Sequence, residues 1–295
     1  GVPRSPASTL KVLTTFASLD VLGPNHHFVT RAYAIGPIDG SRLGGDLMLV
    51  GGGDPAMSVE RWWRFVNAVR ATGLRRIDGD ILVDRRLYAE LDGDPSAFDG
   101  KADQSYNVLP DPLLVNLQSA EFHAVADTEG ARLLVDPSPA NLHIDNAVTV
   151  AADCPASHLR VSPVGDDPLH LTVEGSVGLN CAAHVRRPIM RPTDFAAGTF
   201  ISFWRELGGS FDGSYREAPL PAGATLLAEF ESASLAEIIR LTNKSSNNTM
   251  ARSLLLEMGR ARYGAPTSTA NGERALFDWL VGHQLTLSEL VIDNG

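Results

Sequence analysis

Hydrophobic residues recur at helical spacing near both ends of the chain, whereas they alternate with polar residues in the middle. The first helical pattern predicts a helix over residues 6–22, which Pro6 begins and Gly23-Pro24 ends. Further helices with one apolar face are expected at 58–72, 194–207, 233–243, 249–259 and 270–282.

Alternating patterns predict strands in two regions of the sequence. The first region holds runs at 27–34, 46–50 and 77–83. In the second, clusters of Asp, Gly and Pro separate runs at 120–126, 131–135, 148–151 and 169–173, a spacing typical of a β-sandwich. Residues 290–292 predict one more strand, and 293–295 a turn. We therefore expect an α/β (α+β) multidomain protein in which β-rich insertions split one domain in sequence.

The composition is that of a folded protein and excludes some partners. A chain of 295 residues with 44% hydrophobic residues can bury the cores of two or three domains. Its net charge of -10 argues against a nucleic-acid partner, which requires a basic surface. The histidines show no metal-ligand spacing, so no metal ion and no other cofactor is expected. Asp78, Asp80 and Asp84 flank an apolar run and are expected to be solvated.

The two cysteines, Cys154 and Cys181, do not form a metal-binding motif. We expect a single disulfide formed in an oxidising compartment, and the alternative is two unpaired cysteines in the core. The sequence contains no signal peptide and no run of 18 apolar residues. Because the first strong motif begins at residue 8 and the sequence stops at a turn, we expect a mature fragment of a longer protein.

Lysine is scarce, with Lys11, Lys101 and Lys244 standing against 22 arginines. Lys11 belongs to Ser8-Thr9-Leu10-Lys11, in which positions i and i+3 share one helix face. A serine hydroxyl becomes nucleophilic when a base accepts its proton, and a lysine can do so if burial or nearby cations lower its pKa. The helix N-terminus would favour the developing anion. The motif is weak by itself, since a capping serine followed by an exposed lysine is the ordinary alternative.

A second polar cluster, Lys244-Ser245-Ser246-Asn247-Asn248, separates two apolar helices. One interpretation is helix capping, with Asn248 at the start of the following helix. The functional interpretation is a Ser-x-Asn motif that faces a cleft. In that case Ser246 passes a proton to a leaving amine and Asn248 holds a substrate amide.

These two motifs resemble Ser-x-x-Lys and Ser-Asp-Asn of penicillin-binding proteins and class A β-lactamases. The surrounding sequence resembles the low-molecular-mass class C penicillin-binding proteins, the D-alanyl-D-alanine carboxypeptidase/endopeptidase family, along essentially the whole chain. The matching strings are 4–11, 19–24, 51–55, 106–110, 243–252 and 292–295. The 238 residues from Ser8 to Ser246 exceed the gap in a class A β-lactamase and leave room for inserted domains.

The resemblance implies a β-lactamase/transpeptidase-like catalytic domain interrupted by β-rich inserted domains. The expected divisions are a penicillin-binding catalytic domain at 1–30 and 227–295, incomplete at both ends, an inserted domain II at 31–86 and 163–226, and a β-rich domain III at 87–162 nested in domain II.

The resemblance also implies roles for single residues. Ser8 attacks the carbonyl of the penultimate D-alanine and forms an acyl-enzyme, with Lys11 as its general base. The Ser8 backbone N–H supplies half of the oxyanion hole. Ser246, with Lys244 nearby, relays a proton to the departing D-alanine, and Asn248 binds the peptide amide.

The resemblance also implies a substrate-contacting position in the insert and a third motif. Tyr106, and more loosely Asp103, matches a family position in the insert that approaches the diamino-acid side chain of the substrate. The third family motif, Lys-Thr-Gly, is missing because no lysine follows Lys244, and we expect it to lie beyond residue 295.

The leading hypothesis is an active-serine D-alanyl-D-alanine carboxypeptidase/endopeptidase of the periplasm. It would act on peptidoglycan stem peptides and be acylated by β-lactams. The alternatives are a serine β-lactamase or esterase and a non-catalytic cell-wall-binding protein that lacks the third motif. The long insert and the second motif argue against the β-lactamase. Peripheral membrane contacts and homo-oligomers are left open.

Overall fold

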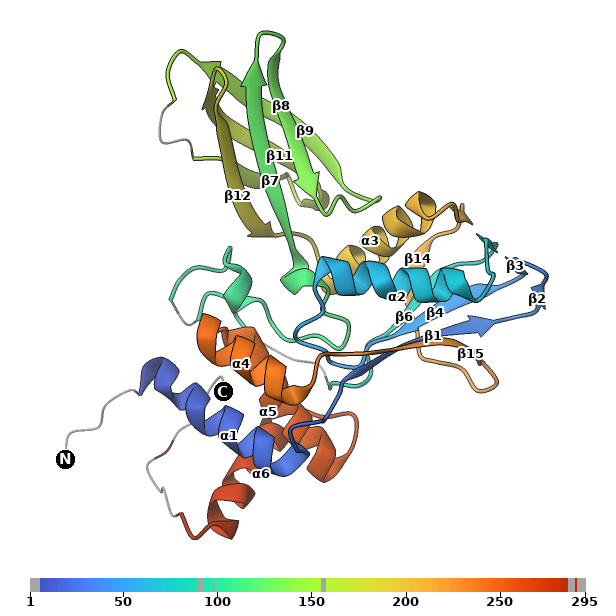
Figure 1. Cartoon of the computed structure of the whole chain (residues 1–295), viewed down its shortest axis with the longest axis vertical. Coiled ribbons are helices and arrows are strands. Elements are labelled where there is room, and N and C mark those ends of the chain that lie inside the picture. Colours follow the sequence, from blue (N-terminus) through green and yellow to red (C-terminus); the bar gives the residue numbers. More distant parts are fainter. Residues whose placement is uncertain (1–5, 90–92, 98, 155–157, 286–289, 291–295) are drawn as a thin grey trace.

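The computed structural model describes residues 6–89, 93–97, 99–154, 158–285 and 290. Figure 1 shows a helical part at the bottom, a part made of sheet and helices above it, and a β-rich part at the top. The turn predicted at 293–295, nearly all of the strand predicted at 290–292, and residues 4 and 5 of the first family string lie outside the described residues.

Both ends of the chain contribute to the helical part. A short 3₁₀ turn, η1 (Ala7–Thr9), leads into α1 (Leu10–Leu22), which packs against α4 (Leu235–Ser245), α5 (Asn248–Tyr263) and α6 (Thr269–Gly282). Ala17 of α1 is fully buried in an apolar cluster with Leu255 of α5 and Leu276 of α6. The four helices predicted in this part are confirmed, with ends displaced by a few residues.

The middle part is built on a five-stranded sheet in the order β14-β6-β4-β1-β15. Its strands are β1 (Val29–Ile35), β4 (Asp46–Val50), β6 (Ile81–Asp84), β14 (Tyr215–Glu217) and β15 (Thr225–Glu231). Helices α2 (Val59–Ala71) and α3 (Pro192–Glu206) pack together, and Trp62 and Trp204 from them are fully buried in the largest core.

A second, small sheet flanks the middle part in the order β13-β5-β3-β2. It consists of β2 (Ile38–Asp39), β3 (Arg42–Leu43), β5 (Arg76–Ile77) and β13 (Ser210–Phe211). The apolar run at 77–83 predicts one strand, but the structure divides it between β5 and β6, which lie in different sheets. The division occurs where the Asp80 N–H donates to the Asp46 carboxylate over 2.7 Å and Gly79 lies against the Gly45 backbone.

The β-rich part contains two three-stranded sheets. One has the order β12-β7-β8, from β7 (Ser119–Asp127), β8 (Gly130–Asp136) and β12 (Ala182–Pro188). The other has the order β10-β11-β9, from β9 (His143–Ala151), β10 (Arg160–Val164) and β11 (Asp167–Gly178). A disulfide joins Cys154 to Cys181, whose Cα atoms are 6.0 Å apart. Two 3₁₀ turns, η2 (Ser105–Asn107) and η3 (Asn116–Gln118), precede β7.

Strand pairing bears on the domain edges. Strand β12 pairs antiparallel with β7 along its whole length, with Ala182 opposite Val125, so the β-rich part extends to Pro188. Strand β15 pairs with β1, with Val29 opposite Glu231, which places all of β15 in the middle part. From these pairings we propose that the nested β-rich domain spans 119–188, in place of the predicted 87–162.

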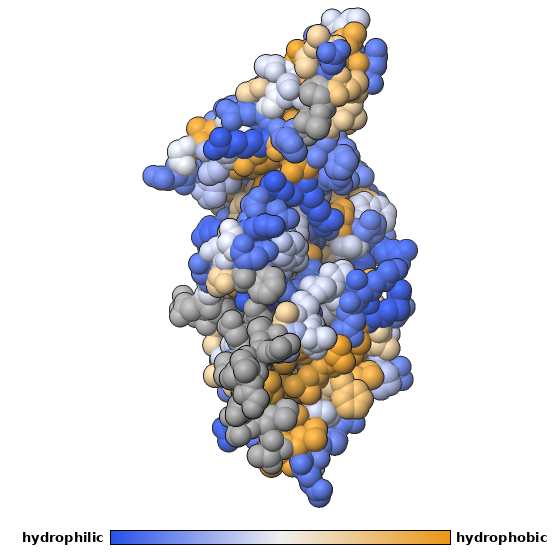
Figure 2. All heavy atoms as spheres, turned by 90° about the vertical axis from the view of Figure 1, so that its left-hand side faces the viewer, coloured by the Kyte–Doolittle hydropathy of each residue, from blue (hydrophilic) through white to orange (hydrophobic). Residues whose placement is uncertain are grey.

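Apolar side chains remain exposed on the helical part. Val12 and Phe16 of α1 are 60% and 59% exposed, although Ala17 of the same helix is fully buried. Figure 2 shows apolar side chains gathered on the lower half of the face that it presents. None of the helices that the structure describes combines the length and the hydrophobicity needed to cross a bilayer.

Asp54, just after the glycines that follow β4, is a buried carboxylate with an incomplete set of partners. One oxygen accepts the Ala56 N–H over 2.8 Å, whereas the other lies 3.9 Å from the Arg61 Nε and accepts no hydrogen bond from the described residues. Burial raises the pKa of Asp54 from 3.8 to about 6, against the opposing effects of the Ala56 N–H and Arg61.

We expect the substitution Asp54→Asn to flatten the pH dependence of stability. A raised folded-state pKa means that the folded protein retains a proton which the unfolded chain loses, so stability falls as pH rises from about 4 to about 6. The shift corresponds to about 3 kcal/mol at pH 7, and a neutral amide at this position would avoid this cost. Urea unfolding of both proteins at pH 4 and pH 7 measures the difference. An equal loss of stability between these pH values in both proteins would contradict the expectation.

Candidate active site

The Ser8 hydroxyl and the Lys11 ammonium group are in contact at the start of α1. Ser8 lies in η1 and is half-buried, and the Lys11 Nζ donates a hydrogen bond to the Ser8 Oγ over 3.0 Å. Only 6% of Lys11 is exposed. Burial lowers the pKa of Lys11, and the positive charge of Arg252 on α5 lowers it further. The pair therefore has a geometry suited to moving a proton from serine to a neutral lysine.

The second motif occupies the junction between α4 and α5. Ser246 ends α4 in a left-handed conformation, with φ of 53°, and is exposed, as is Lys244. Asn247 caps α5, since its side chain accepts the Met250 N–H over 2.9 Å. Asn248 is the first residue of α5 and is buried, so it is not the cap that the alternative interpretation assigned to it.

A contact between α1 and α4 joins the helices that adjoin the two motifs. The Asn243 Nδ2, one residue before Lys244, donates to the Thr15 Oγ1 of α1 over 3.1 Å. Helices α1 and α5 also share the core that contains Ala17. The helical core thus brings together two segments that lie more than 200 residues apart in sequence.

The segment before β7 adds a third group of polar residues. The Asn248 Nδ2 donates to the Asn107 Oδ1 over 3.2 Å, and the Asn107 Nδ2 donates to the Asp99 Oδ1 over 2.7 Å. The hydroxyl of Tyr106 donates to the other oxygen of Asp99 over 2.9 Å. Tyr106 and Asn248 therefore belong to one network, whereas Asp103 forms an ion pair with Arg187, at 3.2 Å.

Asp99 and Asn107 were not predicted from the sequence. Asp99-Gly100 is a common turn pair, and Asn107 lies in the family string 106–110, in which Tyr106 alone was given a role. Their importance depends on contact with Asn248, 141 residues further along the chain from Asn107.

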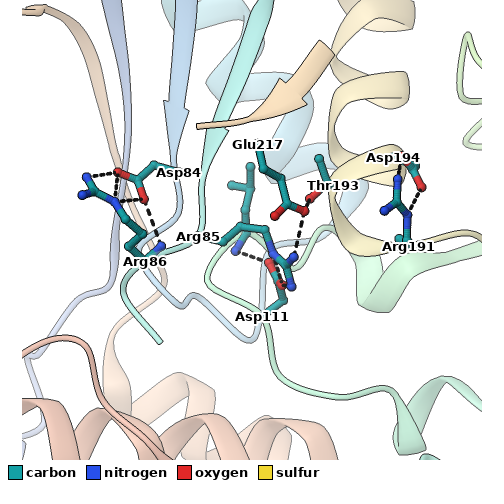
Figure 3. Close-up of polar contacts among 9 residues, drawn as sticks. Asp84, Arg85, Arg86, Asp111, Arg191, Thr193, Asp194 and Glu217 are labelled. Atoms are coloured by element: carbon teal, nitrogen blue, oxygen red, sulfur yellow. Dashed lines mark hydrogen bonds and ion pairs between the residues drawn. The ribbon is translucent and has the colours of Figure 1, made fainter. Parts of the chain in front are cut away.

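A cluster of ion pairs links the same segment to the middle part (Figure 3). Arg85, just after β6, donates from its Nε to Asp111 over 2.7 Å and from its Nη1 to Glu217 of β14 over 2.8 Å. The Thr193 hydroxyl of α3 donates to the same oxygen of Glu217 over 2.5 Å. Burial would lower the pKa of Arg85, but Asp111 and Glu217 raise it. The cluster therefore ties β6, β14 and α3 to the segment that carries Tyr106 and Asn107.

The prediction that Asp84 is solvated is wrong. The residue is buried and accepts hydrogen bonds from the Arg86 guanidinium (Figure 3) and from the Leu220 N–H. Hydrogen bonds from Arg86 and from the backbone outweigh burial and lower the pKa of Asp84.

A hollow of about 890 Å³ borders the ion-pair cluster. Its lining includes Arg85, Asp111, Gln118, Arg191 and Glu217, and none of the described residues that line it belongs to either sequence motif. The candidate active site is therefore identified by the contacts of Ser8 and Asn248. Within the part of the chain that the structure describes, no group of three or more His, Cys, Asp or Glu side chains is arranged to hold a metal ion.

The family described as "D-Ala-D-Ala carboxypeptidase 3 (S13) family" matches residues 1–295. A D-alanyl-D-alanine carboxypeptidase of Actinomadura sp. (strain R39) is 29% identical over 301 residues, which cover 98% of this chain and 54% of the relative. The D-alanyl-D-alanine carboxypeptidase DacB of Haemophilus influenzae is 24% identical over 299 residues, covering 98% of this chain and 61% of the relative. The chain thus spans little more than half the length of these relatives.

Solved structures share the fold. The crystal structure of penicillin binding protein 4 (dacB) from Haemophilus influenzae superposes with a TM-score of 0.79 at 21% identity, over 98% of this chain and 64% of that one. A second crystal structure of the same protein, complexed with a β-lactam, gives a TM-score of 0.71 over the same shares of the two chains. These likenesses confirm the expected α+β architecture.

Proposed function

The chain belongs to the D-Ala-D-Ala carboxypeptidase 3 (S13) family, and on this premise we propose that it is an active-serine D-alanyl-D-alanine carboxypeptidase/endopeptidase acylated at Ser8. The observation that carries the proposal is the 3.0 Å hydrogen bond between the Lys11 Nζ and the Ser8 Oγ, made by a lysine whose pKa burial lowers. The family relationship supplies the substrate class, which is the D-alanyl-D-alanine end of peptidoglycan stem peptides.

The proposed reaction begins with proton transfer from the Ser8 Oγ to the neutral Lys11 Nζ. The serine oxygen bonds to the carbonyl carbon of the penultimate D-alanine, and the bond from that carbon to the terminal D-alanine nitrogen breaks. The departing amine takes the proton that Lys11 received, relayed through Ser246 with Lys244 nearby. Water, or an amine in place of water, then attacks the ester and restores the Ser8 hydroxyl.

The remaining residues are proposed to bind the substrate or to stabilise the oxyanion that forms during acylation. The Ser8 backbone N–H lies near the start of α1, where the helix dipole favours a developing oxyanion. Asn248 is proposed to hold the substrate amide and Tyr106 to contact the diamino-acid side chain. Asp103 is the weaker candidate for the second role, because its carboxylate is paired with Arg187.

We also propose a periplasmic location. The disulfide between Cys154 and Cys181 supports it, because such bonds persist in oxidising compartments. The proposed partners are peptidoglycan peptides and, as inhibitors, β-lactams. The solved relative in complex with a β-lactam supports the second of these partners.

Labelling with a fluorescent penicillin tests the proposed function. We expect one covalent adduct per molecule of the full natural protein, located on Ser8 by mass spectrometry, and none in Ser8→Ala. The absence of any adduct on Ser8 would reject the proposal. Rapid release of hydrolysed penicillin without a lasting adduct would instead indicate a serine β-lactamase.

A further inference from the structure

The side-chain amides of Asn107 and Asn248 form a hydrogen-bonded chain whose direction is fixed at one end. Both residues are buried, at 3% and 4% exposed. The chain ends on Asp99, whose carboxylate also accepts the Tyr106 hydroxyl and the Lys101 N–H. Burial opposes ionisation of Asp99, but these hydrogen bonds and that of Asn107 outweigh it and lower its pKa.

An ionised carboxylate and a backbone carbonyl can only accept hydrogen bonds. The Asn107 amide faces one of each, the Asp99 Oδ1 at 2.7 Å and the Lys101 carbonyl oxygen at 3.0 Å. Its NH₂ group must therefore point toward them, because the reverse orientation would place its oxygen against two acceptors. The Asn107 Oδ1 is then turned toward α5, where it can only accept.

The orientation of the Asn107 amide in turn fixes the orientation of the Asn248 amide. Because the Asn107 Oδ1 is an acceptor, the Asn248 side chain must present its NH₂ group to it, and the 3.2 Å contact is made by the Asn248 Nδ2. Among the described residues, no hydrogen bond occupies the second N–H or the Oδ1 of the Asn248 side chain, so both are left for another partner. An amide that offers one donor and one acceptor matches the C=O and N–H groups of a peptide unit.

We infer that Asp99 is a positioning residue that acts through Asn107 to fix which way the Asn248 amide faces. This inference rests on the proposed function, in which Asn248 holds the amide of the substrate. The Thr249 hydroxyl shares its one proton between the Val108 carbonyl oxygen, at 2.6 Å, and the Tyr106 carbonyl oxygen, at 3.2 Å. This contact holds the segment against the start of α5.

The test compares Ser8 acylation by two β-lactams in the full natural protein, one with an acylamido side chain and one with a free amino group in its place. The ratio of their rate constants reports on recognition of the side-chain amide and does not depend on the amount of folded protein. In Asn107→Asp, a carboxylate replaces the donor that faces the Asp99 carboxylate, so the two charges repel and the acceptor that orients Asn248 is displaced. We expect the ratio to fall about tenfold.

A second substitution separates positioning from a general structural role. In the double variant Asp99→Asn with Asn107→Asp, the donor and the charge exchange places, so the amide at position 99 can hold the carboxylate at position 107 where it accepts from Asn248. We expect the ratio to recover by about threefold or more, although the Lys101 carbonyl loses its donor. Asp94→Asn is the matched control, because Asp94 lies in the same segment and its carboxylate binds only Ser96 among the described residues.

The outcomes distinguish the inference from the proposed function. If the wild-type protein is acylated but the ratio is equal in all variants, the role of Asp99 and Asn107 is overturned and the proposed function stands. A fall in Asn107→Asp without recovery in the double variant also overturns it. If the wild-type protein is acylated by neither β-lactam, the proposed function fails and the inference fails with it.

Discussion

Replacing Lys11 with methionine is expected to lower the rate constant for Ser8 acylation by a penicillin about a hundredfold to ten-thousandfold. Methionine fills the same buried space but has no atom that can accept the Ser8 proton. Lys11→Arg is expected to be as poor, because a guanidinium group stays protonated at all accessible pH values. Measuring adduct formation over time in each variant gives the rate constants. A Lys11→Arg protein with the wild-type rate would show that the lysine is not the base.

The pH profile gives a second readout of the same base. Acylation requires neutral Lys11, so the rate should rise with pH and level off above its pKa. Arg252 lowers that pKa by its charge, and Arg252→Gln should therefore shift the rise to higher pH. A shift toward lower pH would contradict the assignment of Lys11. Lys101→Met, at an exposed lysine in another segment, serves as the control for loss of a positive charge.

Replacing Arg85 with methionine is expected to destabilise the folded protein by about 3–5 kcal/mol. The Asp111 side chain is 1% exposed and would be left as a buried charge without its cation. The loss is measured from the midpoint of guanidinium unfolding, followed by the fluorescence of buried Trp62 and Trp204 in the adjoining core.

Two further variants test whether the loss of stability in Arg85→Met comes from leaving Asp111 without its cation. The double variant Arg85→Met with Asp111→Leu removes both charges and should regain much of the stability. Arg132→Met removes an ion pair with Asp127 that is largely exposed, and we expect it to cost less than about 1 kcal/mol. Equal losses in Arg85→Met and Arg132→Met would show that the Arg85 cluster contributes no more than a surface pair.

The periodic helices could be predicted from the sequence because each carries its own signal. The apolar spacing and the capping residues of α2 and α4 lie within a few residues of one another, and the structure has both helices where the pattern indicates. Strand pairing carries no such local signal. The pairing of β14 with β6, with Tyr215 opposite Ile81, joins residues that are far apart in sequence.

In the candidate site, too, the residues with a local sequence signal were predicted and those that depend on long-range contacts were not. Ser8 and Lys11 were predicted because one helix turn separates them, and the contact between them is made within that turn. Asp99, Asn107 and Asp111 lie in a segment without regular periodicity, and their neighbours come from α5 and β6. Burial of an acidic residue depends on what packs over it, so sequence alone suggested a solvated Asp84 where the structure has a buried one.

The pairing of β1 with β15 has a consequence for the order of events during synthesis. Val29 cannot pair with Glu231 until some 200 further residues have been synthesised. Closing so long a loop costs conformational entropy while those residues are unstructured. The strands from β7 to β12, by contrast, form a continuous stretch whose partners all lie within it. We expect this stretch to fold first and to shorten the effective distance between β1 and β15. The helices that carry Ser8 and Asn248 would then be the last to meet, which makes the candidate catalytic site the final product of folding.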